Sequence, residues 1–254
     1  MAGAGTSVVI REIYARSILV KSQVADYTVN PYVGCQHRCT YCYARFMKRF
    51  TGHKELWGEF VDVKINAPDL LRKEIHRKPP GTVWISGVCD PYQPTERKYE
   101  LTRKCLQILV DGGWPITVQT KSPLVLRDID LFRRSANIEV GLSIATADDD
   151  IRKLFEPNVP SIQARIQALG ELHHAGIRTY AMIAPMLPGA EGLAAELSGK
   201  VDYVLVDRMN YHYGDWVYRK YHLEDAVGNN FFCLKGKELA AAFSEQGVEC
   251  RVLF

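Results

Sequence analysis

The sequence has no long apolar run, little net charge and no secretory leader. No stretch approaches the ~20 apolar residues of a membrane-spanning helix, so we expect a soluble protein with no membrane partner. The N-terminal residues lack a basic start followed by a long apolar segment, which argues against a secretory signal. A net charge of +3 neither indicates nor excludes a nucleic-acid partner, because a local patch matters more than the sum.

Internal repeats, low-complexity segments and linkers of shifted composition are absent as well. The 254 residues, 47% hydrophobic and 24% charged, fit one large domain with a single core. We therefore expect one domain over residues 1–254, and a monomer. The odd number of cysteines, seven, in a chain without a leader indicates reduced thiols, metal chemistry and a cytoplasmic location.

Short β-rich runs alternate with amphipathic stretches over most of the chain. The runs are nearly continuous in apolar residues, as in parallel strands covered on both faces. Candidate strands lie at 27–32, 82–88, 116–120, 138–144, 178–184 and 202–207, candidate helices at 99–110, 125–135, 161–175 and 190–198, and a last helix and strand at 235–246 and 248–254. This alternation predicts an α/β fold with a parallel sheet, either doubly wound or curled into a barrel of fewer than eight units.

Three cysteines, Cys35, Cys39 and Cys42, follow the first of these strands with the spacing C-x3-C-x2-C. A structural zinc site usually takes four ligands as two separated pairs. A [4Fe–4S] cluster can be held by three cysteines, which leaves one iron open for a substrate or cofactor. A zinc site completed by Cys89 or His37 stays as an alternative, whereas the third cysteine argues against a thioredoxin-like pair in "CTYC".

A longer pattern surrounds these cysteines. The string "NPYVGCQHRCTYCYAR", with "SGVCDPYQPTE", "TKSPLVLRD", "LSIAT", "EPNVPSIQARIQAL" and "APMLPG", resembles the spore photoproduct lyase-like branch of the radical S-adenosylmethionine (SAM) superfamily. The resemblance runs in order from about residue 14 to 210. It implies a partial (β/α)6 barrel of the TIM type, with its core at about 27–210 and residues 211–254 covering the open side.

The resemblance also implies cofactors and partners. A [4Fe–4S] cluster on Cys35, Cys39 and Cys42 would bind SAM and cleave it to a 5′-deoxyadenosyl radical, which abstracts hydrogen from the substrate. An electron donor of the flavodoxin or ferredoxin type would reduce the cluster. The implied contacts to SAM are Tyr41, Ser86, Gly87, Asp90 (in place of the usual acidic residue), Lys121, Ser143 and, beside Glu156, Arg165.

The residues alone leave alternatives for several of these contacts. Lys121 could be solvated at its strand end, Ser143 could satisfy a backbone group, and Arg165 could form a surface salt bridge. Cys89 and Tyr43 resemble the cysteine and tyrosine that return hydrogen in photoproduct lyases, although Cys89 is displaced by about two positions. Cys89 could instead be a small buried side chain, and we expect Cys105, Cys233 and Cys250 to be core residues.

The segment 208–225, "RMNYHYGDWVYRKYHLED", interleaves aromatic with basic residues. This composition is typical of surfaces that stack nucleic-acid bases, and equally of a lid packed over a barrel. Three hypotheses follow: a radical enzyme acting on a nucleobase or nucleic acid; a radical enzyme acting on a small molecule or peptide, including a 3-amino-3-carboxypropyl transferase; and a non-catalytic zinc- or cluster-binding protein.

Overall fold

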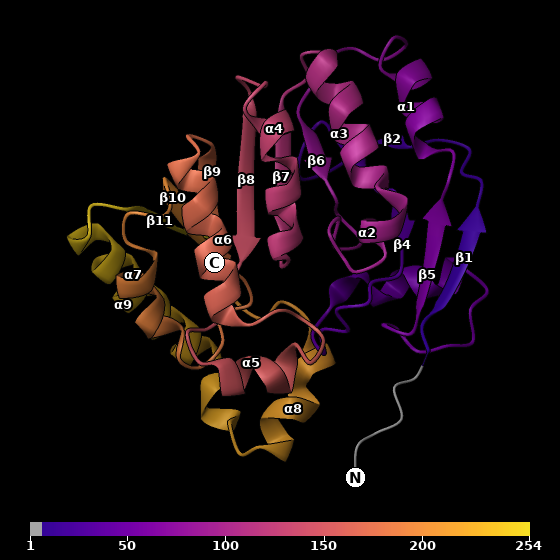
Figure 1. Cartoon of the computed structure of the whole chain (residues 1–254). Helices are drawn as coiled ribbons and strands as arrows, with labels where there is room; N and C mark the ends of the chain where they lie inside the picture. The colour runs from indigo at the N-terminus through magenta and orange to yellow at the C-terminus, as the bar shows by residue number, and fades with distance from the viewer. Residues whose placement is uncertain (1–6) are drawn as a thin grey trace.

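Two β-sheets organise the computed structural model, which describes residues 7–254 (Figure 1). The larger sheet has eight strands in the order β11-β10-β9-β8-β7-β6-β3-β2, and the smaller has the order β1-β5-β4. The strands of the larger sheet are β2 (Leu19–Lys21), β3 (Tyr27–Val29), β6 (Val83–Ile85), β7 (Ile116–Thr120), β8 (Ile138–Ser143), β9 (Arg178–Ile183), β10 (Tyr203–Val206) and β11 (Glu249–Val252). Those of the smaller sheet are β1 (Val9–Ile13), β4 (Tyr32–Val33) and β5 (Phe60–Lys64).

Strands β3, β6, β7, β8, β9 and β10 are parallel and neighbour one another in chain order. These are the six predicted units, so the prediction of a partial (β/α)6 barrel is confirmed. Strand β11 continues the parallel sheet at one edge and β2 pairs antiparallel at the other. Gly141 pairs with Tyr180, and a Cβ at Gly141 would lie 2.2 Å from the tyrosine ring, so only glycine lets this ring cross β8.

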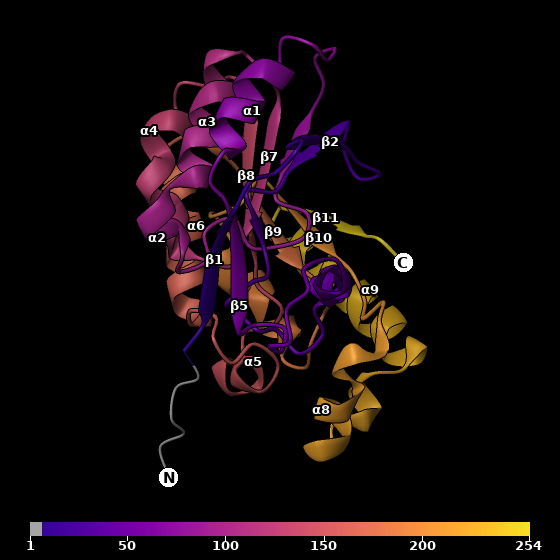
Figure 2. The ribbon, with the colours of Figure 1, turned by 90° about the vertical axis from the view of Figure 1, so that its right-hand side faces the viewer.

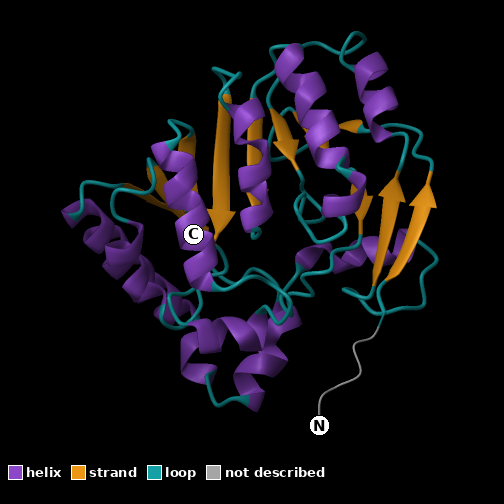
Figure 3. Cartoon of the chain, viewed as in Figure 1, coloured by secondary structure: helices purple, strands orange, loops and turns teal. Residues whose placement is uncertain are grey.

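Helices cover one side of the larger sheet (Figure 2). This group comprises α1 (Ala67–Glu74), α2 (Glu96–Tyr99), α3 (Leu101–Asp111), α4 (Ile129–Phe132) and α6 (Ile162–His174). Figure 3 shows how the strands of the larger sheet lie behind these helices. The remaining helices are α5 (Asp149–Phe155), α7 (Leu193–Leu197), α8 (Asp215–Lys220) and α9 (Asn229–Glu245).

The structure differs from the expected elements in a few places. The helix expected at 125–135 is a 3₁₀ turn, Pro123–Asp128, followed by the short α4. Cys105 is buried and Cys250 partly buried, but Cys233 is exposed, so its prediction as a core residue was wrong. The buried residues of α9 include Phe232, and the next position is turned ~100° away from that face.

The carboxyl ends of the strands form the site end of the molecule. Figure 1 shows α5 and α8 beyond the end to which the arrow of β8 points. Residues 211–254 contribute α8 near this end, while α9 packs on β11 and α7. In residues 7–254 no helix is long and apolar enough to cross a bilayer.

Candidate active site

A cavity of about 540 Å³ opens at the carboxyl ends of the strands. Eleven of the twelve site residues expected from the sequence line it, and Arg165 does not. The eleven are Cys35, Cys39, Tyr41, Cys42, Tyr43, Ser86, Gly87, Cys89, Asp90, Lys121 and Ser143. The cavity also reaches the gap between the two edges of the sheet, where Val24 and Leu253 line it.

The cysteine loop is held in place from several directions. Gly34 turns the chain after β4 with a φ of 89°, and a Cβ there would lie 2.3 Å from the Phe60 carbonyl oxygen. The Thr40 N–H donates to the Phe155 carbonyl at 2.8 Å. Gln93, which is fully buried, donates to the Gly34 carbonyl at 3.1 Å and accepts from the Gln36 N–H at 3.0 Å.

The three cysteines form no disulfide, and all three line the same cavity. Burial raises the pKa of all three, and the charge of Asp90 raises that of Cys35 further. Three bare thiolates would therefore be costly here, whereas a metal keeps its thiol ligands deprotonated. The loop is therefore expected to carry three thiolates when they bind a metal.

Unpaired buried polar atoms test whether a cluster fits. Within residues 7–254, atoms without a hydrogen-bond partner include Thr40 Oγ1, Arg45 Nε and Trp57 Nε1, which belong to the cysteine loop and the segment after it. Buried polar groups are nearly always paired, so these atoms indicate an acceptor that the protein alone does not provide. The described residues contain no set of three His, Cys, Asp or Glu side chains arranged around one ion. Thiolates that bind separate irons need no such convergence, so a [4Fe–4S] cluster fits these residues.

Asn30, which sequence reasoning missed, orders the segment after β6. Its Oδ1 accepts from Ser86 Oγ at 2.7 Å, from the Gly87 N–H at 2.8 Å and from the Val88 N–H at 3.0 Å. Lys64 Nζ donates to the Asn30 carbonyl at 2.8 Å. Two amides of this glycine segment are thereby occupied. The Gly87 carbonyl accepts from the Tyr43 hydroxyl, and a carbonyl oxygen has a second lone pair for a further donor.

Asp90 lines the cavity, but protein groups surround both of its carboxylate oxygens. Oδ1 accepts from the Tyr92 N–H at 2.9 Å and from Thr120 Oγ1 at 2.6 Å, and Oδ2 accepts from the Lys121 N–H at 2.7 Å. His37 Nδ1 lies 3.3 Å from Oδ2. Burial opposes ionisation, yet His37 and these hydrogen bonds lower the pKa of Asp90. The geometry favours a carboxylate that positions the cysteine loop and the end of β7 over one that contacts a ligand.

A buried carboxylate, Glu156, joins several expected contacts. It accepts a hydrogen bond from the Tyr41 hydroxyl, lies 3.5 Å from Lys121 Nζ and 2.7 Å from Arg165 Nη2. Arg165 is fully buried behind the cavity wall and donates to the Ser143 carbonyl at 2.9 Å. Despite burial, the charges of Arg165 and Lys121 lower the pKa of Glu156 to about 2.

Lys121 is therefore the cation of this group that reaches the cavity, and its ammonium lies 5.8 Å from the centre of the Tyr41 ring. Ser143 forms part of the cavity wall, where its Oγ accepts from Gln119 Nε2 at 3.0 Å. Lys121 can bind an anion such as a carboxylate.

Cys89 and Tyr43 lie on the glycine segment's side of the cavity. Cys89 Sγ is 3.1 Å from Ser86 Oγ, and burial raises the pKa of its thiol to about 12. The Tyr43 hydroxyl donates to the Gly87 carbonyl. Partial burial of Tyr43, which is 47% exposed, followed by the charges of Cys42 and Cys89, raises its pKa to about 12. Both groups hold their hydrogen at neutral pH.

A row of aromatic rings extends from Tyr43 along the rim of the cavity. Tyr43 stacks on Tyr211 with ring centres 6.0 Å apart, and Tyr211 stacks on Tyr213 at 6.0 Å and 7°. The Arg45 guanidinium lies 4.6 Å from the centre of the Tyr213 ring. The three tyrosines are each at least 39% exposed, so part of each ring is open to a partner. The row joins the 3₁₀ helix η1 (Tyr43–Phe50) to the segment after β10.

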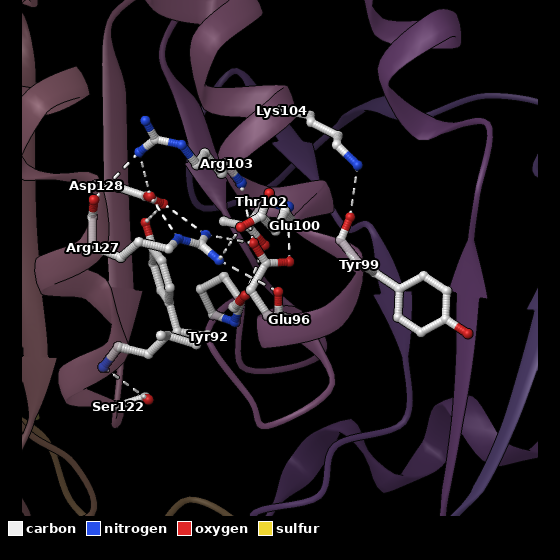
Figure 4. Close-up of polar contacts among 12 residues, drawn as sticks. Tyr92, Glu96, Tyr99, Glu100, Thr102, Arg103, Lys104, Ser122, Arg127 and Asp128 are labelled. Carbon is white, nitrogen blue, oxygen red and sulfur yellow. Dashed lines mark hydrogen bonds and ion pairs between the residues drawn. The ribbon is translucent and has the colours of Figure 1, made fainter.

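A second buried network holds the loops behind the cavity (Figure 4). Arg127 lies between two fully buried carboxylates, 2.7 Å from Glu96 and 2.8 Å from Asp128. Asp128 also accepts from Tyr92 at 2.9 Å and from Arg103 at 2.7 Å. The network fixes the loop after β6 against the loop after β7, which carry Cys89 and Lys121.

Comparison with known families identifies this arrangement. Residues 29–191 match the radical SAM superfamily. The chain belongs to the radical SAM superfamily. Enzymes of this superfamily bind a [4Fe–4S] cluster and SAM, and this radical SAM enzyme has both as its cofactors.

Relatives of this radical SAM enzyme give its fold more firmly than its substrate. It is 44% identical over 164 residues to an uncharacterized protein of Methanocaldococcus jannaschii, which covers 65% of this chain and 61% of that one. It is 26% identical over 161 residues to the radical SAM Nalpha-GlyT isomerase of Pseudomonas phage M6, over 63% of this chain and 33% of the relative. The chain thus spans from one third to about three fifths of the length of these relatives.

A solved structure of spore photoproduct lyase, complexed with dinucleoside spore photoproduct, superposes with a TM-score of 0.72. The alignment covers 96% of this chain and 82% of the lyase at 14% identity. At this identity the likeness shows a common fold.

Proposed function

We propose that this enzyme abstracts a hydrogen atom from a nucleobase of a nucleic acid strand. The observation that carries the proposal is the row of Tyr43, Tyr211 and Tyr213, capped by Arg45, at the rim of the cavity that holds the three cysteines. Exposed aromatic faces beside a cation are the usual platform for single-stranded nucleic acid. A base that leaves this platform for the cavity would meet the radical site.

When bound, the cluster and SAM supply a 5′-deoxyadenosyl radical, with electrons from a carrier of the flavodoxin or ferredoxin type. The chain's own residues bind and orient the reactants. Lys121 is proposed to bind the methionyl carboxylate, the carbonyls of Ser86 and Gly87 the methionyl amine, and Tyr41 to pack beside the adenine. Ser143 is proposed to contact the ribose.

Cys89 and Tyr43 are proposed to return hydrogen to the product. The Cys89 S–H gives its hydrogen atom to the substrate radical, and the Tyr43 O–H restores the S–H. The tyrosyl radical would take a hydrogen atom from 5′-deoxyadenosine. The deoxyadenosyl radical so formed would recombine with methionine to SAM and return one electron to the cluster, so that no net electron is consumed. The high pKa of both groups supports this role, because a thiolate or phenolate has no hydrogen atom to give.

The first test is cleavage of SAM. Protein reconstituted under nitrogen and reduced with dithionite should form 5′-deoxyadenosine, and Cys42→Ala, without one cluster ligand, should form none. Formation of methylthioadenosine instead would favour a 3-amino-3-carboxypropyl transferase. Intact SAM in a protein that binds zinc and no iron would contradict radical chemistry.

The second test is binding of a fluorescent single-stranded oligonucleotide. Loss of one stacking ring costs about 1–3 kcal/mol, so Tyr211→Ala should weaken binding by about 5- to 150-fold. Tyr14→Ala is the matched control, since Tyr14 is 78% exposed and does not line the cavity. Binding that is insensitive to salt and equal in both variants would contradict a nucleic-acid substrate.

A further inference from the structure

Trp57 packs against the cysteine loop with a buried, unpaired N–H. The residue is 9% exposed, belongs to one apolar cluster with Cys35, Ala44 and Phe60, and meets the Phe60 ring edge-on at 5.8 Å between centres. Its indole N–H completes no hydrogen bond within residues 7–254. A buried tryptophan N–H normally has an acceptor, so this one indicates an acceptor supplied at the site.

The sulfur of Cys42 is the candidate acceptor, because Cys42 packs against the apolar cluster of Trp57 and lines the cavity. Cys42 is partly buried and borders the same apolar cluster as Trp57. A protonated thiol accepts hydrogen bonds weakly, and the Cys42 sulfur becomes a charged acceptor when it binds iron.

We propose that Trp57 donates an N–H···S hydrogen bond to iron-bound Cys42 and thereby raises the reduction potential of the cluster. The inference rests on the cofactor of the superfamily. Reduction adds negative charge to the cluster and its thiolates, and a donor aimed at one sulfur stabilises this charge. Hydrogen bonds to the sulfurs are among the features that set the potential of iron–sulfur clusters.

The test is a redox titration of reconstituted protein under nitrogen, without SAM, followed by the absorbance and EPR spectra of the cluster. Trp57→Phe keeps an aromatic ring and removes the N–H. It should lower the equilibrium constant for one-electron reduction by about tenfold, which corresponds to ~59 mV. An unchanged potential in this variant would overturn the proposal.

Phe60→Leu is the matched control, because it alters packing in the same apolar cluster and leaves the indole N–H in place. Its equilibrium constant should stay within about twofold of the wild type. An equal fall in Phe60→Leu would also overturn the proposal, since packing or water access would then explain both. If Trp57→Phe binds fewer than four irons, 3-benzothienylalanine at position 57 removes the N–H at constant shape. A lowered reduction potential in that protein would support the proposal, and an unchanged potential would overturn it.

The titration separates this inference from the proposed function. A wild-type protein that binds no iron would defeat both. A wild-type protein that cleaves SAM while Trp57→Phe keeps its potential would defeat the role of Trp57 alone.

Discussion

Two buried charge networks meet the loop after β7, and they differ in what they leave unpaired. Behind the cavity, Glu96 and Asp128 are fully buried and each accepts hydrogen bonds from several protein donors. At the cavity wall, Glu156 holds Arg165 and Lys121, but Lys121 Nζ has no described acceptor closer than 3.5 Å. A satisfied network gives the loops a fixed position, whereas a cation with spare donors in a cavity is available to a ligand.

The difference follows from the physics of buried charge. Removing a charge from water costs several kcal/mol, and only good geometry with every donor and acceptor used offsets this cost. The network behind the wall meets that condition with protein groups alone. The network at the wall would meet it when an anionic ligand reaches Lys121. We therefore expect mutations behind the wall to change stability, and mutations at the wall to change ligand binding.

Glu96→Gln is the change with the largest expected effect on stability. The two carboxylate oxygens of Glu96 accept from the Tyr32 hydroxyl, from the Thr102 and Arg103 N–H groups and from Arg127. The amide NH₂ of glutamine would face donors in either orientation, and Arg127 would lose a partner. Breaking such a pair costs about 3–5 kcal/mol, to be measured as the free energy of unfolding in urea.

The control for Glu96 is Glu100→Gln, because Glu100 lies 3.9 Å from the same Arg127 and is 47% exposed. Its loss should cost less than about 1 kcal/mol, as for exposed pairs. SAM affinity of folded Glu96→Gln should stay within about twofold of wild type. A large loss of SAM affinity in Glu96→Gln would show that the two networks are coupled and that the network behind the wall also controls ligand binding.

Lys121→Met should weaken SAM binding more than it lowers the free energy of unfolding, the opposite of Glu96→Gln. It removes the cation at the cavity and keeps much of the aliphatic side chain. A charge-assisted hydrogen bond contributes about 1.5–3 kcal/mol, so the dissociation constant for SAM should rise about 10- to 150-fold. Equilibrium binding to reconstituted protein without reductant measures this directly.

Two further variants sharpen the result. Lys98→Met is the control at an exposed lysine outside the cavity and should leave affinity unchanged. Lys121→Arg keeps the charge and should recover part of the affinity. Unaltered SAM binding in Lys121→Met would remove Lys121 from the site, and the open network at the wall would need another explanation.

The sequence predicted the site better than the details of its support. The six parallel strands, the cysteine loop and the shared cavity follow from periodicity and from motifs in order along the chain. The smaller sheet was missed because charged residues interrupt the apolar residues of its strands, which read VIREI in β1 and FVDVK in β5. Asn30 and Gln93 were missed because their hydrogen bonds join residues 56 to 59 positions apart. No local pattern records such a contact.

Arg165 shows a different limit of prediction from the sequence. Its place on an amphipathic helix was predicted, but depth was not: the guanidinium is fully buried against Glu156 and the Ser143 carbonyl. Helical periodicity indicates which face a residue occupies, whereas the partners of Arg165 come from other segments: Glu156 follows α5 and Ser143 ends β8. Its role as a contact to SAM stays a prediction.

An ion pair whose carboxylate is partly exposed provides the comparison for both networks, and its loss should have the smallest effect on stability. Asp149 begins α5, lies 2.8 Å from Arg152 and accepts from the Ile162 N–H at 3.0 Å. The hydrogen bond from Arg152 lowers the pKa of Asp149 from 3.8 to about 2, against the opposing effect of burial. Because the carboxylate is 37% exposed, solvent screening limits the contribution of the pair to about 0.2–1 kcal/mol.

The pH dependence of this contribution has a definite sign. The folded-state pKa is the lower one, so the stabilisation is complete above about pH 4 and disappears as the pH falls through about 2. Asp149→Asn should therefore melt below the wild type from pH 5 to 7, with the difference closing under acid conditions. Thermal unfolding of both proteins at matched ionic strength measures it. A difference that widened at low pH, or that reached the size expected for Glu96→Gln, would show that exposure does not separate surface pairs from the buried networks of this fold.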